Sequence, residues 1–461
     1  MTDRFARTDG STTAQCVNGY EGYCGGTWKG IAQKLDYIKG MGFDAVWISP
    51  VTKQIDSPSG SRGYHGYSQQ DLYQVNQNFG TEQDLKDLAS ALHKKEMYLM
   101  VDVVTNHFGY SGDVATIDYS TLNPFKSSTD FHKFCEMQDT DDMTILTTCD
   151  LGTSSSPLPD VATTSPSVRA EFNKWIKQII STYSIDGLRV DSVKNVEQEF
   201  WGQFQSAAGI YAVGEVSDGR TDHACPYQNN GLDGILNYPM YFQLTYFFND
   251  SSTKSANLLN IMSDVRSKCK DSTLLAPFAE NHDQARFGSY TKDMSLATNV
   301  IAFTMLADGI PIIYSGQEQH LSGGHDPFDR EAIWLTGYQT TPLTKAITSL
   351  NAIRKLAISK ASSYVNYAPE VITSTDHIFA IRKGDIGSQI VAVYNNLGQD
   401  ENTPILLPVT TGFGVGTEVM EVLTCKPSIV QSKTLTANVS RGMPLVFFPT
   451  AGLKGSGICG Q

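Results

Sequence analysis

Residues 185–193 read IDGLRVDSV and residues 210–216 read IYAVGEV. Both runs are short and mostly apolar, and each carries an acidic residue near its end, Asp191 in the first and Glu215 in the second. Runs of this length and composition are typical of buried strands in a parallel sheet. An amphipathic helix is expected just before the first run, because Ser165-Pro166 is followed by apolar residues spaced 4-3-4: Val168, Phe172, Trp175 and Ile179.

The same alternation of apolar runs and helical patterns extends in both directions along the chain. Further strands are expected at residues 43–51, 98–104, 234–240, 273–279 and 309–315. Strands alternating with helices over ~350 residues predict a TIM (β/α)8 barrel, with its first strand at an N-terminus that we expect to be truncated. The alternative is an open doubly wound sheet, but no Gly-x-Gly-x-x-Gly follows an early strand.

Two segments depart from this alternation. Residues 108–164 are rich in Ser, Thr and Asp, and so long a loop predicts a small inserted domain. From residue 364 to 461 the apolar pattern has period two, which predicts a C-terminal β-sandwich. We therefore expect a catalytic barrel of residues 1–107 and 165–363, an inserted domain of 108–164 and a sandwich of 364–461.

Composition narrows the classes of ligand. The chain has 48 acidic and 35 basic residues, a formal net charge of -13, which argues against nucleic acid. No run approaches the ~18 apolar residues of a membrane span. A neutral ligand and a monomeric protein are expected.

The eight cysteines contain no C-x-x-C spacing, so a zinc or redox motif is not expected. The simplest pairing joins sequence neighbours as 16–24, 135–149, 225–269 and 425–459. Disulfides and the sequons at Asn249 and Asn438 indicate a secreted or cell-wall-associated glycoprotein. Polar residues follow Met1 directly, so no signal peptide is expected in this chain.

Carboxylates close several of the expected strands. They are Asp102, Asp191, Glu215 and Asp283. The carboxyl ends of barrel strands form the active-site face, and glycoside hydrolysis needs two carboxyl groups. Arg189 lies two residues before Asp191 on the same strand, so both side chains point to one face and the arginine favours the ionised carboxylate.

Four short segments in order resemble the signature segments of fungal α-amylases, and the resemblance covers nearly the whole chain. They are 102–107 (DVVTNH), 187–195 (GLRVDSVKN), 214–216 (GEV) and 278–283 (FAENHD), with an additional family segment at 158–160 (LPD). This resemblance implies an α-1,4-glucan substrate and a double-displacement mechanism. The expected disulfides also agree with the fungal pattern.

The resemblance assigns roles to individual residues. Asp191 is implied as the nucleophile, Glu215 as the general acid and base, and Asp283 as the group that stabilises the transition state. Substrate-binding positions are implied at Arg189, His107, His282, His65, Tyr67, Lys194, Asp326 and Arg330. A retaining pair predicts that the carboxyl groups of Asp191 and Glu215 lie ~5–5.5 Å apart.

Calcium is implied between the barrel and the inserted domain. Its expected ligands are Asn106, Asp160 and the backbone carbonyl of Asn195, oxygen donors of the kind that Ca²⁺ prefers. The family's acidic ligand before Cys149 is missing, since Thr147 lies there. Three nearby acids are candidate replacements: Asp139, Asp141 and Asp142.

Two departures from the family leave the reaction open at this point. Asn195 stands where the family has His, and Ser68 follows Tyr67 where an aromatic residue is usual. Both positions are expected on the acceptor side, which favours a 4-α-glucanotransferase of the kind related to fungal cell-wall α-glucan as the alternative to an α-amylase. A third hypothesis is an inactive glucan-binding protein, against which the intact Asp191, Glu215 and Asp283 argue.

Overall fold

The computed structural model describes residues 1–16, 20–56, 63–431 and 434–461. Its contacts divide the chain into two compact units. The first contains residues 1–39, 43–236 and 330–338, and the second contains residues 40–42, 237–329 and 339–461.

A five-stranded parallel sheet forms the centre of the first unit. Its strands in spatial order are β1 (Ala45–Ile48), β4 (Tyr98–Val104), β5 (Gly187–Asp191), β6 (Tyr211–Gly214) and β7 (Gly234–Ile235). Each pairs in parallel with the next along the chain, and the order never reverses. Strands added in one direction are the arrangement of a barrel, whereas a doubly wound sheet changes direction at a switch point. The predicted barrel topology therefore holds for these strands.

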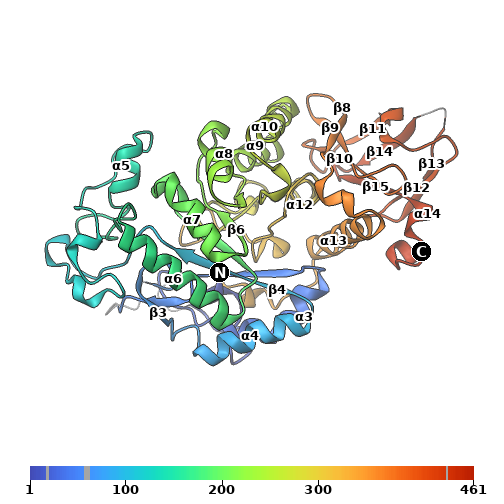
Figure 1. The fold of residues 1–461 in the computed structure, drawn as a ribbon. Helices are drawn as coiled ribbons and strands as arrows, with labels where there is room; N and C mark the ends of the chain where they lie inside the picture. The colour runs from blue at the N-terminus through green and yellow to red at the C-terminus, as the bar shows by residue number, and fades with distance from the viewer. Residues whose placement is uncertain (17–19, 57–62, 432–433) are drawn as a thin grey trace. The chain divides into compact units, whose positions relative to one another are not determined.

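Helices connect these strands, as Figure 1 shows by colour along the chain. In the first unit they are α1 (Thr2–Phe5), α2 (Trp28–Gln33), α3 (Leu35–Gly40), α4 (Glu82–Lys94), α6 (Pro166–Tyr183), α7 (Gln198–Ala208) and α8 (Thr221–Asn230). The helix α4 begins with the capping box between Thr81 and Asp84. The predicted apolar face of α6 is buried, but Ser165 makes no side-chain capping bond, so the start of α6 depends on Pro166 at its first turn.

The segment 108–164 contains only short elements. They are the 3-10 helices η1 (Val114–Thr116), η2 (Tyr119–Thr121) and η3 (Ser128–Asp130), and α5 (Met143–Thr148). A separate antiparallel pair, β2 (Thr52–Gln54) and β3 (Gln69–Val75), precedes α4. Backbone pairing of His107 with Asp160 joins the end of β4 to this segment.

The second unit begins with helical elements. They are α9 (Tyr238–Asn249), α10 (Ser255–Lys268), α11 (Phe287–Tyr290), α12 (Met294–Leu306) and α13 (Pro342–Lys360). The strand predicted at 234–240 is therefore wrong from Tyr238 onward. Pro239 in the first turn of α9 and the Asn237 side chain, which accepts from the Met240 N–H, begin a helix there instead.

The expected strands at 273–279 and 309–315 are extended and paired but make no continuous ladder. Leu275 and Pro277 carbonyls accept from the N–H groups of Ile310 and Ile312. Pro277 and Pro311 have no N–H to donate, which interrupts regular strand pairing.

The C-terminal part of this unit is all-β, as predicted. A six-stranded sheet has the order β13 (Lys426–Ile429), β12 (Glu418–Glu421), β15 (Leu445–Pro449), β10 (Ile390–Asn395), β9 (Ile378–Lys383) and β8 (Glu370–Ser374). A second sheet pairs β11 (Asn402–Leu407) with β14 (Leu435–Ser440), and α14 (Thr450–Leu453) follows. Side chains from both sheets form one apolar core, which includes Val391 of β10 and Val439 of β14. Figure 1 shows these strands in orange and red.

Three of the predicted disulfides are present: Cys16–Cys24, Cys135–Cys149 and Cys425–Cys459. Their Cα–Cα distances are 4.6, 4.8 and 5.2 Å. Cys225 and Cys269 are disulfide-bonded as well. Within the described ranges, no helix has both the length and the apolar character to cross a bilayer.

Candidate active site

The buried guanidinium group of Arg189 binds three carboxylates at the carboxyl end of the parallel sheet. Arg189 Nη1 lies 2.7 Å from Asp191 Oδ1 and 3.0 Å from Asp102 Oδ1, and Arg189 Nη2 lies 3.0 Å from Glu215 Oε2. The Arg189 and Asp102 side chains are almost fully buried, while Asp191 and Glu215 keep 9% and 13% of their side-chain surface. The two residues predicted to do the chemistry are therefore the accessible members of the cluster.

Strand register explains the convergence. Arg189 and Asp191 are two residues apart on β5, so their side chains share one face, as predicted. Asp102 on β4 is the register partner of Arg189. Glu215 follows β6, and its N–H donates to the Val190 carbonyl of β5 (2.8 Å). The side chains of Asp102, Arg189, Asp191 and Glu215 thus lie together because they come from neighbouring parallel strands.

Burial dominates the electrostatics of the cluster. The pKa of Asp102 is raised to about 7, mainly by burial and also by the Asp191 carboxylate, against the opposing effect of Arg189. Burial alone would lower the pKa of Arg189, but the surrounding carboxylates raise it well above its ordinary value. Arg189 is therefore a permanent cation among three acids.

Ser192 binds the carboxylates of both Asp191 and Glu215 and was not singled out from the sequence. Its hydroxyl donates to Asp191 Oδ2 (2.7 Å) and its N–H donates to Glu215 Oε2 (3.1 Å). Ser192 has φ 50°, a left-handed conformation that turns the chain immediately after β5. A serine in a loop gives no sequence signal for such a role, because the role depends on this backbone turn.

Two of the predicted substrate-binding residues, His65 and Tyr67, form an aromatic platform that lies against the same cluster. The Tyr67 hydroxyl donates to Asp102 Oδ2 (2.8 Å), and the Trp47 indole N–H donates to the same oxygen (3.2 Å). The rings of His65 and Tyr67 are stacked, with centroids 5.6 Å apart and planes at 14°. The Tyr67 N–H donates to His65 Nδ1 (2.9 Å), which fixes the histidine ring.

His107, Lys194 and Arg330 are held by polar groups of the first unit. His107 Nε2 lies 3.0 Å from the Tyr67 carbonyl, so His107 supports the platform residue through its backbone. Lys194 Nζ donates to the Ser217 carbonyl (2.9 Å). Arg330 Nη1 donates to the Tyr64 hydroxyl (2.8 Å), next to His65.

The remaining predicted residues belong to the second unit. His282 Nε2 lies 3.5 Å from Asp283 Oδ2, and the Asp283 side chain is 36% exposed. The Asp283 N–H donates to the Asn281 side chain (3.0 Å), whose amide nitrogen donates to the Tyr238 hydroxyl (2.8 Å). Asp326 precedes Pro327 in a cis peptide bond.

The predicted calcium ligands converge within the first unit. The end of the Asn106 carboxamide lies 2.8 Å from the Asn195 carbonyl oxygen and 3.2 Å from Asp160 Oδ1. Backbone bonds hold this arrangement, since the Val161 N–H donates to the Asn106 carbonyl (2.9 Å). With the Asn106 oxygen in this position, three oxygen atoms face one another, which is the donor set that a hard cation prefers.

The neighbouring His107 selects that orientation of Asn106. Nε2 of His107 faces a carbonyl oxygen, an acceptor only, and therefore carries the ring hydrogen. A neutral ring then has a lone pair on Nδ1, which accepts from the Asn106 amide nitrogen at 3.3 Å. This bond turns the Asn106 oxygen toward Asp160 and Asn195, so the residues present fit a calcium ion.

The acids considered as replacement ligands have other partners. Asp141 pairs with Arg220 (2.6 Å), and Asp142 caps α5. Asp139 accepts from the Asp141 N–H. The described residues contain no cluster of three or more His, Cys, Asp or Glu side chains suited to a metal ion. The candidate site therefore depends on amide and carbonyl oxygens together with Asp160.

Both departures that favoured a transferase are buried. Asn195 is 4% exposed, and its side-chain amide donates to the Leu146 carbonyl of α5 (3.2 Å). Ser68 is 7% exposed, and Gly109 packs so closely that a Cβ there would lie 2.8 Å from Ser68. These contacts give no support to the expectation that the two side chains meet an acceptor sugar, because each is enclosed by the inserted segment or its junction.

Comparisons with known proteins agree with the geometry. Residues 1–362 match the α-amylase catalytic domain family, and residues 371–461 match α-amylase domain C. The chain is 47% identical to α-amylase 2 of Schwanniomyces occidentalis over 100% of this chain and 90% of that protein. It is 46% identical to an α-amylase of Saccharomycopsis fibuligera, over 97% of this chain and 90% of that protein.

Solved structures extend this agreement to the fold. An α-amylase from Malbranchea cinnamomea superposes with a TM-score of 0.96 at 46% identity, covering 100% of this chain and 97% of that one. An α-amylase from Geobacillus thermoleovorans, complexed with acarbose, gives a TM-score of 0.82 at 27% identity, covering 97% and 96%. The fold is the α-amylase fold, with a TIM-barrel-type sheet and a C-terminal β domain. The chain belongs to the α-amylase family of glycoside hydrolases.

Proposed function

We propose that this chain is a retaining, endo-acting α-1,4-glucan hydrolase that cleaves starch-type and glycogen-type glucans through a β-glycosyl-enzyme. The observation that supports it most is the pair of accessible carboxylates, Asp191 and Glu215, bridged by Arg189 and by Ser192. Two carboxyl groups at one point are what a double displacement needs. In this proposal Asp283 stabilises the positive charge that develops on the sugar.

The first step forms the glycosyl-enzyme. Arg189 provides the counter-charge to the Asp191 carboxylate, which attacks the anomeric carbon while the bond to the leaving oxygen breaks. Glu215 gives its proton to that oxygen. N–H groups of Arg189 and Ser192 donate to Glu215 Oε2, so we assign the transferable proton to Oε1.

The second step releases the sugar with its configuration retained. Glu215, now ionised, removes a proton from water, and the water oxygen attacks the anomeric carbon as the bond to Asp191 breaks. The Ser192 hydroxyl and Arg189 stabilise the departing Asp191 carboxylate. Hydrolysis is favoured over transfer because neither Asn195 nor Ser68 presents a side chain to an acceptor sugar.

Calcium belongs to this proposal as a structural ion. When bound, it would supply positive charge to Asn106, Asp160 and the Asn195 carbonyl, and so join β4, the inserted segment and the turn after β5. We also propose the domain division 1–107 with 165–363, 108–164, and 364–461. A monomer that is secreted or associated with the cell wall, with a glucan as its partner, fits the disulfides of the chain.

Maltoheptaose is the substrate that tests the proposed function. A hydrolase releases only shorter sugars, and a glucanotransferase also produces longer ones. An inactive glucan-binding protein leaves the substrate unchanged. Glu215→Gln is the matched control, since it keeps the shape of the site and removes the transferable proton. Longer products at an early stage of the reaction would contradict the assignment.

A further inference from the structure

We propose that Arg4, near the start of the chain, is a positioning residue for the sugar-binding side chains of this site. This inference rests on the proposed function, because it concerns the residues assigned there to the substrate. Arg4 is 1% exposed and lies within the first unit. Its guanidinium carbon lies 4.4 Å from the centroid of the Tyr64 ring, and Tyr64 accepts the hydrogen bond of Arg330.

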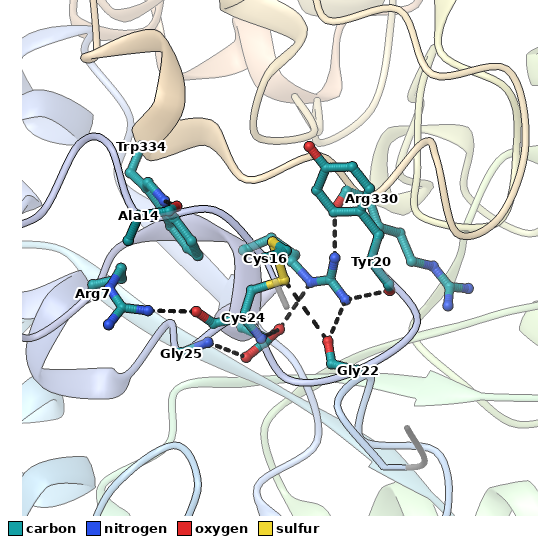
Figure 2. The surroundings of a disulfide bond; sticks show 11 residues. Arg7, Ala14, Cys16, Tyr20, Gly22, Cys24, Gly25, Arg330 and Trp334 are labelled. Carbon is teal, nitrogen blue, oxygen red and sulfur yellow. Dashed lines mark hydrogen bonds and ion pairs between the residues drawn. A yellow bond between two sulfur atoms is a disulfide. The ribbon is translucent and has the colours of Figure 1, made fainter. Parts of the chain in front are cut away.

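A closed network of backbone groups holds Arg4 in place. Its guanidinium donates to three carbonyls: Arg330 (3.1 Å), Tyr20 (2.7 Å) and Gly22 (2.9 Å). Figure 2 shows Tyr20, Gly22 and Arg330 grouped beside the Cys16–Cys24 disulfide. The segment before Gly25 is therefore tied to the segment that begins at residue 330 through one side chain.

Asp3 fixes the other side of this network. Its carboxylate accepts from the Cys24 N–H (2.8 Å), the Gly25 N–H (3.1 Å) and Arg4 Nε (2.9 Å). Gly26 permits the close approach, because a Cβ there would lie 2.3 Å from the Thr2 carbonyl oxygen. These bonds leave the Arg4 side chain almost no freedom to move. Arg4 therefore also fixes the position of the Tyr64 ring that packs against it.

Tyr64 is the link from Arg4 to the sugar-binding residues. It is 4% exposed, and its ring lies against Arg4 while its hydroxyl accepts from Arg330. On its other side it meets His65 edge to face, with centroids 5.1 Å apart. His65 in turn stacks on Tyr67, which donates to Asp102 of the carboxylate cluster. Arg4 thus acts on both ends of the candidate sugar-binding set, Arg330 and the His65–Tyr67 pair.

Only an arginine satisfies these contacts together. A planar guanidinium reaches several carbonyls at once and stacks on an aromatic ring, whereas the lysine ammonium is a compact charge on a flexible stem. Arg4→Lys keeps the positive charge beside Asp3 but not the simultaneous bonds to Tyr20, Gly22 and Arg330. Tyr64→Phe keeps the ring against Arg4 and removes the hydroxyl that accepts from Arg330.

Arg7 offers a matched control that contacts the same disulfide. It donates to the Cys24 carbonyl (2.6 Å), pairs with Asp9 (3.0 Å) and lies near the Trp334 ring. Figure 2 shows Arg7 beside Cys24 and Trp334. Arg7→Gln therefore perturbs the contacts of Cys24 and leaves the Arg4–Tyr64 contact in place.

The test measures KM and kcat on maltoheptaose, together with Tm, for Arg4→Lys, Tyr64→Phe and Arg7→Gln. Calorimetric Kd values for maltoheptaose in the Glu215→Gln background give a readout that needs no turnover. Loss of a hydrogen bond to a charged group predicts a rise of about tenfold in KM and Kd for Arg4→Lys and Tyr64→Phe, with kcat nearly unchanged. Arg7→Gln should lower Tm and leave KM and Kd at the wild-type values.

Wild-type KM and Kd in both Arg4→Lys and Tyr64→Phe, whatever their Tm, would overturn the proposal and leave Arg4 a purely structural residue. Should the wild-type chain bind maltoheptaose without cleaving it, the proposed hydrolysis fails, while the Kd values still decide the role of Arg4. Absence of maltoheptaose binding by the Glu215→Gln chain would overturn the sugar-site assignment and the positioning role together.

Discussion

At the scale of single residues, the site is organised by one cation among three acids. Arg189 contacts Asp102, Asp191 and Glu215 within 3.0 Å. Asp102 is buried and accepts from Tyr67 and Trp47 in addition, so it orients the platform and the arginine without being accessible itself. The two carboxylates to which we assign the chemistry, Asp191 and Glu215, keep some exposure.

Replacing Arg189 by lysine should therefore strongly lower the catalytic activity. One ammonium group cannot take the place of a planar fork that binds three carboxylates, and two of the acids would lose their counter-charge. We expect Arg189→Lys to lower kcat by about 100-fold or more. Steady-state kinetics on maltoheptaose would measure it. Arg382→Lys, which alters the Arg382–Glu370 pair (2.6 Å), is the control, and equal activity of the two variants would contradict this role.

Asp102 should leave a signature in the pH dependence of stability. Burial raises its pKa from the ordinary value of 3.8 to about 7 in the folded chain, because burial disfavours the charged form. Between these values the folded state binds the extra proton, so this carboxyl lowers the free energy of unfolding as pH rises from about 4 to about 7. Asp102→Asn should remove that contribution.

Denaturant unfolding of wild type and Asp102→Asn across this pH range measures the effect. The difference in unfolding free energy should move in favour of the variant as pH rises. Parallel pH profiles for the two proteins would show that Asp102 has the same proton affinity in the folded and unfolded chains.

Some of these residue contacts were predictable from sequence and some were not. The alternation of side chains along a strand was enough to place Arg189 and Asp191 on one face. Tyr64 and Arg330, by contrast, are 266 positions apart, and Arg4 and Arg330 are 326 apart. Without the folded chain, nothing in the local pattern around Arg4 or Ser192 indicates their partners.

At the scale of elements, the candidate calcium site connects β4, the inserted segment and the turn after β5. Asn106, Asp160 and Asn195 come from these three places, and His107 links them to Tyr67. A cation bound here would stabilise the folded chain by mass action, by about 2.7 kcal/mol when free calcium is 100 times its Kd. Chelation should lower Tm, and calcium rather than magnesium should restore it.

An unchanged melting curve with excess chelator would leave Asn106 and Asp160 as ordinary hydrogen-bonding residues. Asp36→Asn, which alters the exposed pair with Lys95, serves as the control variant and should keep the same response to chelator.

A substitution of the Asn195 side chain tests the same region. Because its amide donates to the Leu146 carbonyl, Asn195→Ala leaves a buried acceptor without this donor and should lower Tm. The product pattern on maltoheptaose should stay that of the wild type. A change in the ratio of shorter to longer sugars would instead restore the acceptor-side role that the sequence suggested.

The elements themselves were predictable where one pattern was strong. Residues 98–104 are β4 from end to end, and the period-two runs of the C-terminal part are β9, β10 and β15. The strand prediction failed at residues 238–240, because an apolar run there also fits the start of a buried helix. The Asn237 cap and Pro239 in the first turn favour the helix. At 273–279 and 309–315 the prolines limited strand pairing.

At the scale of the whole molecule, family membership and site geometry lead to the same reaction. The family models match residues 1–362 and 371–461, and the carboxylate cluster lies at the carboxyl ends of consecutive parallel strands. The central claim is that Asp191 and Glu215 act by double displacement, which predicts a carboxyl separation of ~5–5.5 Å and retention at the anomeric carbon.

Proton NMR of the first reducing ends released from maltoheptaose tests this claim most directly. Spectra are recorded within the first minutes, before the fresh ends mutarotate. Double displacement through Asp191 predicts that the α-anomer appears first and the β-anomer grows in later by mutarotation. Initial release of the β-anomer would mean single displacement with inversion, and would contradict the roles assigned to Asp191 and Glu215.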